Sequence, residues 1–187
     1  LHETIAKEME KSRKAKFERG IIPFKDTDDS EWFFTYVSEM AGKGWISGYF
    51  DSKGKSLGEF RPQNNLTVAE ALKIALRSSG DNVIPEDRGP KVALAKGHWA
   101  EGYFMAGENL GVSLALNNNT LPDREITRAE FVKLVLQVYG MTAEKREKSI
   151  FSDVDPIFVP ELDYIEKAVE LGIIEGYEDG TFRPVDP

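Results

Sequence analysis

One pattern of aromatic, apolar and glycine residues occurs three times in the chain, and this repetition constrains its fold more than any other feature. In each copy an aromatic residue directly precedes an apolar one, and a glycine follows seven positions after the apolar residue. The copies are Tyr36, Val37 and Gly44; Tyr103, Phe104 and Gly111; and Tyr164, Ile165 and Gly172. Three matches in one register indicate an array of related units.

Each copy has the pattern of a short helix that ends at its glycine. Apolar residues recur at three- and four-residue spacing, which places them on one helix face. In the first copy these are Phe33, Tyr36, Val37 and Met40, and in the third they are Tyr164, Ile165, Ala168, Val169 and Leu171. The first two copies begin at Trp32 and Trp99, and a tryptophan on an apolar helix face usually packs in a core.

A second kind of helix begins at a threonine that has glutamate three residues later. This is the spacing of a capping box, in which the two side chains close exposed N–H groups at a helix start. The pairs are Thr67 with Glu70 and Thr127 with Glu130, and the expected helix stops are Gly80 and Gly140. The apolar stripes that should face a core are Ala71, Leu72, Ala75 and Leu76, then Phe131, Leu134, Val135 and Val138.

These patterns predict helices near residues 31–43, 67–79, 99–110, 127–139 and 161–171, with almost no sheet. Between the two kinds of helix, the first and third copies share a Gly-Tyr turn, at Gly48 and Gly176, that leads to a Phe-Arg-Pro triplet. The triplet arginines, Arg61 and Arg183, precede proline, so extended backbone is expected there. A solvated or ion-paired arginine is the more ordinary interpretation of each, and a ligand contact is the alternative.

In this order and spacing, the pieces resemble an S-layer homology repeat. Its opening is matched by Phe151-Ser152-Asp153-Val154, Leu171-Gly172-Ile173-Ile174 and Gly180-Thr181-Phe182-Arg183-Pro184. Its helix-starting motif is matched by Ile126-Thr127-Arg128-Ala129-Glu130-Phe131. The resemblance extends from Phe24 to Pro187.

The resemblance implies a mainly α domain in which three repeats surround a central three-helix bundle with pseudo-threefold symmetry. The expected parts are an N-terminal helix at 1–19, repeat 1 at 20–80, a degenerate repeat 2 at 81–140, and repeat 3 at 141–187, which stops before its motif helix. The N-terminal segment, Glu3 to Arg19, is rich in helix formers. It is expected to close the bundle, in this chain or by exchange into a neighbour, or else to be a helical linker.

Domains of this family hold bacterial surface proteins non-covalently to secondary cell-wall polymers, often pyruvylated glycans, in grooves between repeats. The resemblance therefore implies an extracellular module of the cell surface or S-layer, with a cell-wall polysaccharide or peptidoglycan-linked polymer as its partner. Arg128 would face a ligand carboxylate, and Trp32 and Trp99 would pack against sugar. Either Gly48 or Gly176 would let the backbone approach the ligand.

Two departures from the family pattern favour a second hypothesis. Val68 stands where the first motif helix should have arginine, and Pro160 stands where the third copy should have tryptophan. Degenerate repeats of this kind could instead make protein–protein contacts with neighbouring copies or other surface proteins. The alternative function is thus a structural module of a surface lattice or filament that binds no glycan.

Composition narrows the choice of partner. The net charge of −8 disfavours nucleic acid and anionic lipid, and no apolar run approaches the roughly 20 residues that cross a bilayer. The chain has no cysteine, no phosphate loop, no zinc spacing and no catalytic constellation, so no cofactor, metal or enzymatic role is expected. The aspartates near each repeat start are interpreted as turn or capping residues in preference to calcium ligands: Asp26, Asp28, Asp29, Asp153 and Asp155.

Overall fold

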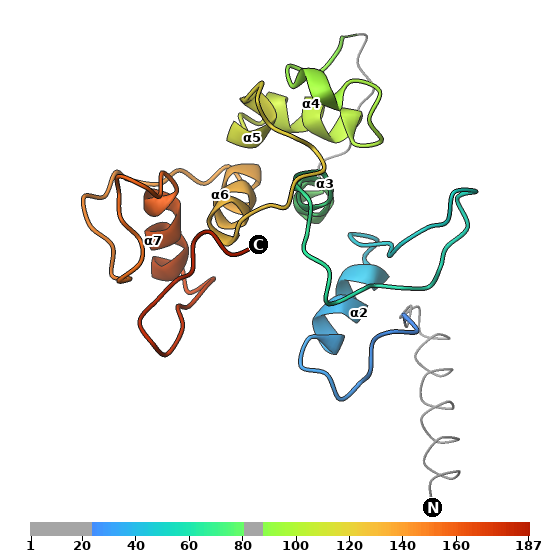
Figure 1. The fold of residues 1–187 in the computed structure, drawn as a ribbon, viewed down its shortest axis with the longest axis horizontal. Coiled ribbons are helices and arrows are strands. Elements are labelled where there is room, and N and C mark those ends of the chain that lie inside the picture. Colours follow the sequence, from blue (N-terminus) through green and yellow to red (C-terminus); the bar gives the residue numbers. More distant parts are fainter. Residues whose placement is uncertain (1–23, 81–87) are drawn as a thin grey trace, which may run out of the picture. The chain divides into compact units, whose positions relative to one another are not determined.

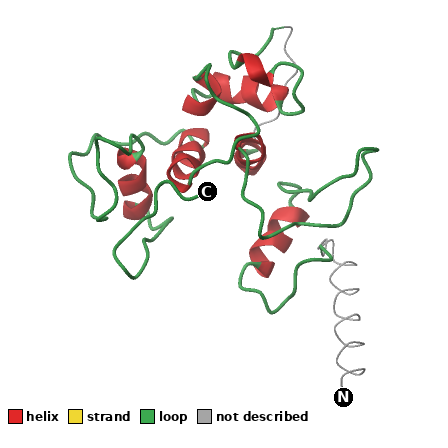
Figure 2. Ribbon diagram, viewed as in Figure 1, coloured by secondary structure: helices red, strands yellow, loops and turns green. Residues whose placement is uncertain are grey.

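The computed structural model describes residues 24–80 and 88–187 (Figure 1). The predicted N-terminal helix from Glu3 to Arg19 lies outside the described residues. The chain divides after Asn64 into two compact units, which are described separately. Among the described residues every regular element is helical, and extended pairing is limited to isolated bridges (Figure 2). The expected mainly α fold class is therefore confirmed, and the threefold bundle stays a prediction.

The helices follow the predicted ranges closely. They are α2 (Phe34–Gly42), α3 (Val68–Ser79), α4 (Glu101–Asn109), α5 (Ser113–Leu116), α6 (Arg128–Val138) and α7 (Leu162–Glu170), with a 3-10 turn, η1 (Ala93–Ala95). The four-residue α5 and the three-residue η1 were not predicted, because such short elements carry no helical periodicity. In the described part of the chain, no helix is long and apolar enough to span a membrane.

The first unit is built around α2. Its buried face consists of Phe34, Val37, Ser38 and Ala41. The predicted face was wrong at Tyr36, which is 64% exposed, because Phe34 takes the buried position one turn before Val37. The loop that follows α2 returns to the start of the unit, where the rings of Phe24 and Phe60 lie 5.7 Å apart.

The second unit contains α3 and α6, the two helices that begin with the threonine motif. Helix α3 packs against α4 and α6, and α6 packs against α7 (Figure 1). The predicted stripe of α3 is fully buried, and that of α6 is buried or half-buried in the same core. A second core lies between α6 and α7, around Ile165, Ala168 and Phe182, whereas Leu171 is 46% exposed and leaves its predicted stripe.

The starts of α3 and α6 are satisfied in the same way. In both helices the threonine side chain accepts from the N–H three residues later, and the glutamate side chain accepts from the threonine N–H. These are the two capping boxes that the sequence predicts. The next N–H groups bind a later part of the chain: those of Val68 and Ala69 donate to the carbonyls of Arg124 and Pro122, and those of Arg128 and Ala129 to the carbonyls of Asp186 and Pro184. Each motif helix is thus fixed at its N-terminus by the loop of the following repeat.

The backbone at Arg61 and Arg183 contradicts the sequence prediction. Their φ angles are +57° and +59°, in the left-handed region, and not extended. The physical reason is an aspartate from the start of the same repeat. Asp153 accepts hydrogen bonds from the N–H groups of Phe182 and Arg183, both at 2.8 Å, and Asp26 does the same for Phe60 and Arg61 at 2.8 and 2.7 Å. Two adjacent N–H groups converge on one carboxylate only if the chain turns sharply there.

Candidate ligand-binding site

Arg128 is the first residue of α6, and its side chain lies over the turn of the third repeat. Its guanidinium carbon is 5.2 Å from the centre of the Tyr177 ring and 4.7 Å from that of Phe182. One terminal nitrogen, Nη2, donates to the Glu175 carbonyl at 3.1 Å, whereas the buried Nε has no hydrogen-bond partner among the described residues. Burying an unpaired N–H costs about 1–3 kcal/mol, so this arginine is held at a cost to stability.

Arg183 approaches the same tyrosine. Its guanidinium carbon lies 3.9 Å from the centre of the Tyr177 ring, so Tyr177 contacts both Arg128 and Arg183. Asp179 accepts from Arg183 at 3.1 Å. Hydrogen bonds from Thr181, with a further one from Arg183, lower the pKa of Asp179 to about 2. The pair is therefore ionised at neutral pH, and of the two arginines Arg128 is the one that contacts no carboxylate among the described residues.

The first unit repeats this turn, and among its described residues none takes the role of Arg128. Arg61 lies over the Tyr49 ring at 4.4 Å and binds Glu59 through two nitrogens, at 2.9 and 2.8 Å. Lys25 also contacts Glu59 at 2.6 Å, and hydrogen bonds from Lys25 and Arg61 lower the pKa of Glu59. Both triplet arginines are thus ion-paired.

Close packing explains why glycine is required at the two turn positions, Gly48 and Gly176. A Cβ on Gly176 would overlap the Phe151 ring and lie 2.9 Å from the Thr181 carbonyl oxygen. A Cβ on Gly48 would overlap the Phe24 ring and the Glu59 carbonyl, and its φ of +65° independently favours glycine. A ligand contact at either glycine stays a prediction.

The two tryptophans do not pack in a core, so the core interpretation is wrong for both. Trp32 is 81% exposed and Trp99 is 56% exposed, because each precedes its helix and does not lie on the buried face. Trp32 makes an edge contact with Phe33, and Trp99 makes one with Tyr103 on α4. Exposed indoles are available for contact with a ligand, as the sugar-packing alternative requires.

The sequence identified Arg128, Arg183 and Gly176 separately, and the structure places all three around one turn. It also adds Tyr177, Phe182 and Asp153, which complete this site. The tyrosine had a signal in the sequence, because Gly-Tyr occurs at the same point in the first and third repeats. The role of Asp153 had no local signal, since its partners lie 29 and 30 residues away.

The capping glutamate of α6 has a further role. Arg124 donates to both carboxylate oxygens of Glu130, at 2.7 and 2.6 Å. Burial raises the pKa of Glu130, but hydrogen bonds from Arg124 and Thr127 outweigh this effect, so the net pKa is lowered. The helix start that carries Arg128 is therefore held by an ionised carboxylate at neutral pH.

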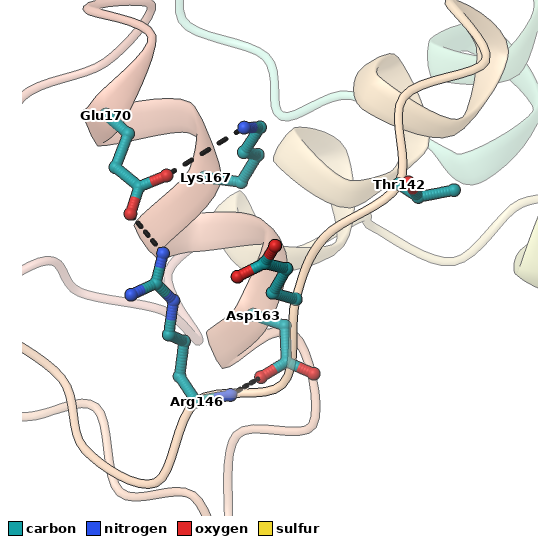
Figure 3. A pocket seen from close by; sticks show the side chains of 6 residues that line it. Thr142, Arg146, Asp163, Lys167 and Glu170 are labelled. Atoms are coloured by element: carbon teal, nitrogen blue, oxygen red, sulfur yellow. Dashed lines mark hydrogen bonds and ion pairs between the residues drawn. The ribbon is translucent and has the colours of Figure 1, made fainter.

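A polar cavity of about 270 Å³ lies elsewhere in the second unit, between α7 and the loop before it (Figure 3). Its lining residues are Thr142, Glu144, Arg146, Asp163, Lys167 and Glu170. The charges in this cavity already contact one another: Arg146 donates its backbone N–H to Asp163 at 2.7 Å and its guanidinium to Glu170, and Lys167 lies 3.9 Å from Glu170. The described residues include no group of three that could hold a metal ion.

Comparison with known proteins identifies a family and several relatives that this chain resembles. The family model described as S-layer homology domain matches residues 23–72 and 150–187. The chain is 32% identical over 154 residues to Cell surface glycoprotein 1 of Acetivibrio thermocellus, covering 76% of this chain and 6% of that protein. It is 31% identical over 141 residues to the Cellulosome-anchoring protein of the same organism, covering 71% of the chain and 31% of the relative.

An Endoglucanase of a Bacillus species is 25% identical over 171 residues, which cover 87% of this chain and 17% of the enzyme. The chain thus spans less than a third of the length of each of these three relatives.

Proposed function

This chain belongs to the S-layer homology family, and we propose that it anchors a bacterial surface protein non-covalently to the cell envelope by binding a cell-wall polysaccharide. Membership of the family makes it a cell-surface module. The glycan, a polymer bearing carboxylates such as pyruvate ketals, is our proposal for what it holds there. The names of two relatives, a cell surface glycoprotein and a cellulosome-anchoring protein, support an anchoring role.

One observation carries the proposal for this site. The Arg128 guanidinium is fixed over Tyr177 and Phe182 without a carboxylate partner among the described residues. A guanidinium can bind a carboxylate through two parallel hydrogen bonds, which are stronger than bonds between neutral groups. Because the chain carries a net charge of −8, long-range attraction does not favour an anionic glycan. Local contacts of this kind must therefore supply the affinity.

We assign no catalysis to the chain. The match to an endoglucanase covers 17% of that enzyme, a share that suits an attached anchoring module and not the whole catalytic protein. Glycosidases need two carboxylates placed on either side of a bond. In the turn of the third repeat, Asp153 and Asp179 instead bind backbone, hydroxyl or arginine groups of the chain itself.

The test is retention of Arg128→Ala on sacculi purified from the cells that produce the protein. Wild-type chain should sediment with the sacculi, and Arg128→Ala should lose most of this retention while its melting temperature stays near that of wild type. Lys148→Ala, which removes the same charge at an exposed position, is the matched control and should bind normally. Equal retention of Arg128→Ala and wild type would refute the role of this site.

A second function, assembly with other surface proteins, is favoured by a separate observation. Ile157 and Phe158 are 80% and 79% exposed on the turn before α7. Pro160 stands two residues further on, where the first two repeats have tryptophan. If these side chains mediate assembly, sedimentation velocity should show self-association of the glycan-free chain that Ile157→Ser with Phe158→Ser abolishes.

A further inference from the structure

His98, the single histidine among the described residues, lies just before α4 and makes contacts through both ring nitrogens. Its Nδ1 accepts a hydrogen bond from the Ala100 N–H at 3.2 Å, and its Nε2 lies 3.0 Å from a carboxylate oxygen of Asp123. Because a backbone N–H can only donate, Nδ1 is the acceptor, and Nε2 carries the proton that is donated to Asp123. A neutral imidazole therefore satisfies both contacts at once.

The contact with Ala100 closes the start of α4. Ala100 directly precedes the first residue of the helix, and its own side chain cannot cap it. The residue is fully buried, so water does not reach its N–H. The next N–H, that of Glu101, donates to the His98 carbonyl at 2.9 Å. His98 thus accepts from two successive N–H groups at a helix start, where the backbone N–H groups have no partners within the helix.

The contact with Asp123 connects this helix start to the turn before α6. The carbonyls of Pro122 and Arg124 in this turn accept from the first two N–H groups of α3. The Arg124 guanidinium binds Glu130 in the first turn of α6. The imidazole of His98 therefore links the start of α4 to the turn that fixes the starts of both α3 and α6.

We propose that His98 is a pH-sensitive helix cap, whose protonation releases the start of α4 as the surroundings become acidic. Histidine side chains typically change their charge between about pH 5 and 8. Both nitrogens of a protonated imidazole are donors, so Nδ1 would then face the Ala100 N–H as donor against donor. The bond to Ala100 is lost, while the contact with Asp123 becomes an ion pair. The inference does not depend on any ligand of the chain.

The balance between these two contacts favours release. The lost bond leaves a buried N–H unpaired, and a positive charge beside a helix N-terminus is itself unfavourable. The ion pair that replaces it is weak, because the Asp123 side chain is 77% exposed and exposed pairs contribute little to stability. Protonation therefore weakens the start of α4 more than the contact with Asp123 can restore.

The other charged groups around the imidazole cannot replace the lost acceptor. They come from the loop before α4, from α4, from α3 and from the turn before α6, and are Lys96, Glu101, Lys73 and Arg124. Three of these four are cations, which do not accept hydrogen bonds. The Glu101 carboxylate accepts from the Gly97 N–H at 3.0 Å. The Ala100 N–H thus depends on the imidazole.

The corresponding position differs in the other two repeats. Glu31 stands directly before Trp32 in the first repeat, and Val159 stands directly before Pro160 in the third. A carboxyl group ordinarily titrates well below the range of histidine, and valine does not titrate. The pH-sensitive contact is therefore a feature of the second repeat.

The test is nuclear magnetic resonance of the full chain labelled with nitrogen-15, in a His2→Gln background that leaves His98 as the single histidine. At about pH 8 the imidazole should carry its proton on Nε2. As the pH falls to about 5, the Ala100 amide proton should move upfield with the same midpoint as the imidazole, because its acceptor is lost. A proton on Nδ1 at the higher pH, or an Ala100 amide that stays constant while the imidazole titrates, would overturn the proposal. Neither result requires a change at His98.

His98→Asn is the matched control. An asparagine oxygen can cap a helix start but does not titrate in this range, so the Ala100 amide of this variant should not respond to pH. At about pH 5.5 the Ala100 and Glu101 amides should exchange with solvent roughly fivefold faster in the His98 protein than in His98→Asn, the net of a lost buried bond and a gained exposed pair. At about pH 8 the two rates should agree. Equal rates at both pH values would contradict release of the helix start.

Asp123→Asn separates the two contacts of the imidazole. This variant should keep the titration of the Ala100 amide and move its midpoint to lower pH, because the imidazolium loses its carboxylate partner. Loss of the Ala100 titration in Asp123→Asn would show that the carboxylate, and not protonation at Nδ1, controls the helix start, and the proposal would fail.

Discussion

Replacing Asp153 by alanine should destabilise the third repeat, although this side chain lies at the surface. The carboxylate accepts hydrogen bonds from the N–H groups of Phe182 and Arg183, and it thereby holds Arg183 at a φ of +59°. The Phe182 side chain is fully buried beneath this turn. Without the acceptor, the N–H of Phe182 is left unpaired next to the core, and the left-handed arginine loses the contact that favours it.

The magnitude follows from these contacts. A hydrogen bond to a charged group contributes about 1.5–3 kcal/mol, and the more exposed second bond adds less. We expect Asp153→Ala to lower the free energy of unfolding by about 3 kcal/mol. In a chain of this size, that corresponds to a fall in melting temperature of roughly 6–12 °C. Because Phe182 supports Arg128, retention on sacculi should fall as well.

The assay is urea unfolding followed by circular dichroism, with Asp155→Ala as the control. Asp155 accepts from the N–H of Ile157 in an exposed turn two residues away, so its loss should cost less than about 1 kcal/mol. Asp26→Ala is the counterpart in the first unit and should resemble Asp153→Ala. A loss of less than about 0.5 kcal/mol for Asp153→Ala would refute the reasoning, since surface changes without a structural role fall in that range.

Three further changes test other parts of the structure. The lowered pKa of Glu130 stabilises the fold at pH values above the unfolded pKa of this carboxyl group, and this contribution is lost as the pH falls through the folded pKa. The difference in unfolding free energy between wild type and Glu130→Gln should therefore shrink on acidification in urea titrations at several pH values. A constant difference would contradict the ion pair with Arg124. Gly176→Ala should cost about 1–3 kcal/mol through overlap with the Phe151 ring, whereas Gly89→Ala, which meets no neighbour, should be nearly neutral in the same melting experiment. Leu72→Ala removes a fully buried side chain from the core beside α3 and should cost about 2–5 kcal/mol, and a cost below 1 kcal/mol would show that this core is not packed as described.

The helices were predictable because their signals are local. A capping box needs two residues three positions apart, and the glycines that end α3 and α6 adopt the left-handed conformation that glycine favours. Both features are visible in a short stretch of sequence. The buried stripe of α3 likewise follows from its spacing alone.

The errors at the two triplet arginines and at the two tryptophans have different physical origins. Arg61 and Arg183 were expected in extended backbone because proline follows them, but an aspartate 35 or 30 residues earlier binds their N–H groups and imposes a turn. The core interpretation of Trp32 and Trp99 assumed that they lie on an apolar helix face, yet both precede the first helical turn and lie outside the buried face. Their contact with sugar stays a prediction.

For the binding sites, the sequence could name residues but not group them. Arg128, Gly176 and Arg183 were each singled out from motifs, whereas their common contact with the turn around Tyr177 required coordinates.

The central claim, that the chain is held to the cell wall by an anionic polymer, is tested most directly by equilibrium binding to two preparations of the same sacculi. One preparation is native, and the other has been stripped of its anionic polymer while the peptidoglycan is kept. We predict saturable binding of the wild-type chain to native sacculi and loss of that binding on the stripped ones. Released polymer, added to the native assay as a competitor, should inhibit the binding. Equal binding to native and stripped sacculi would contradict the account.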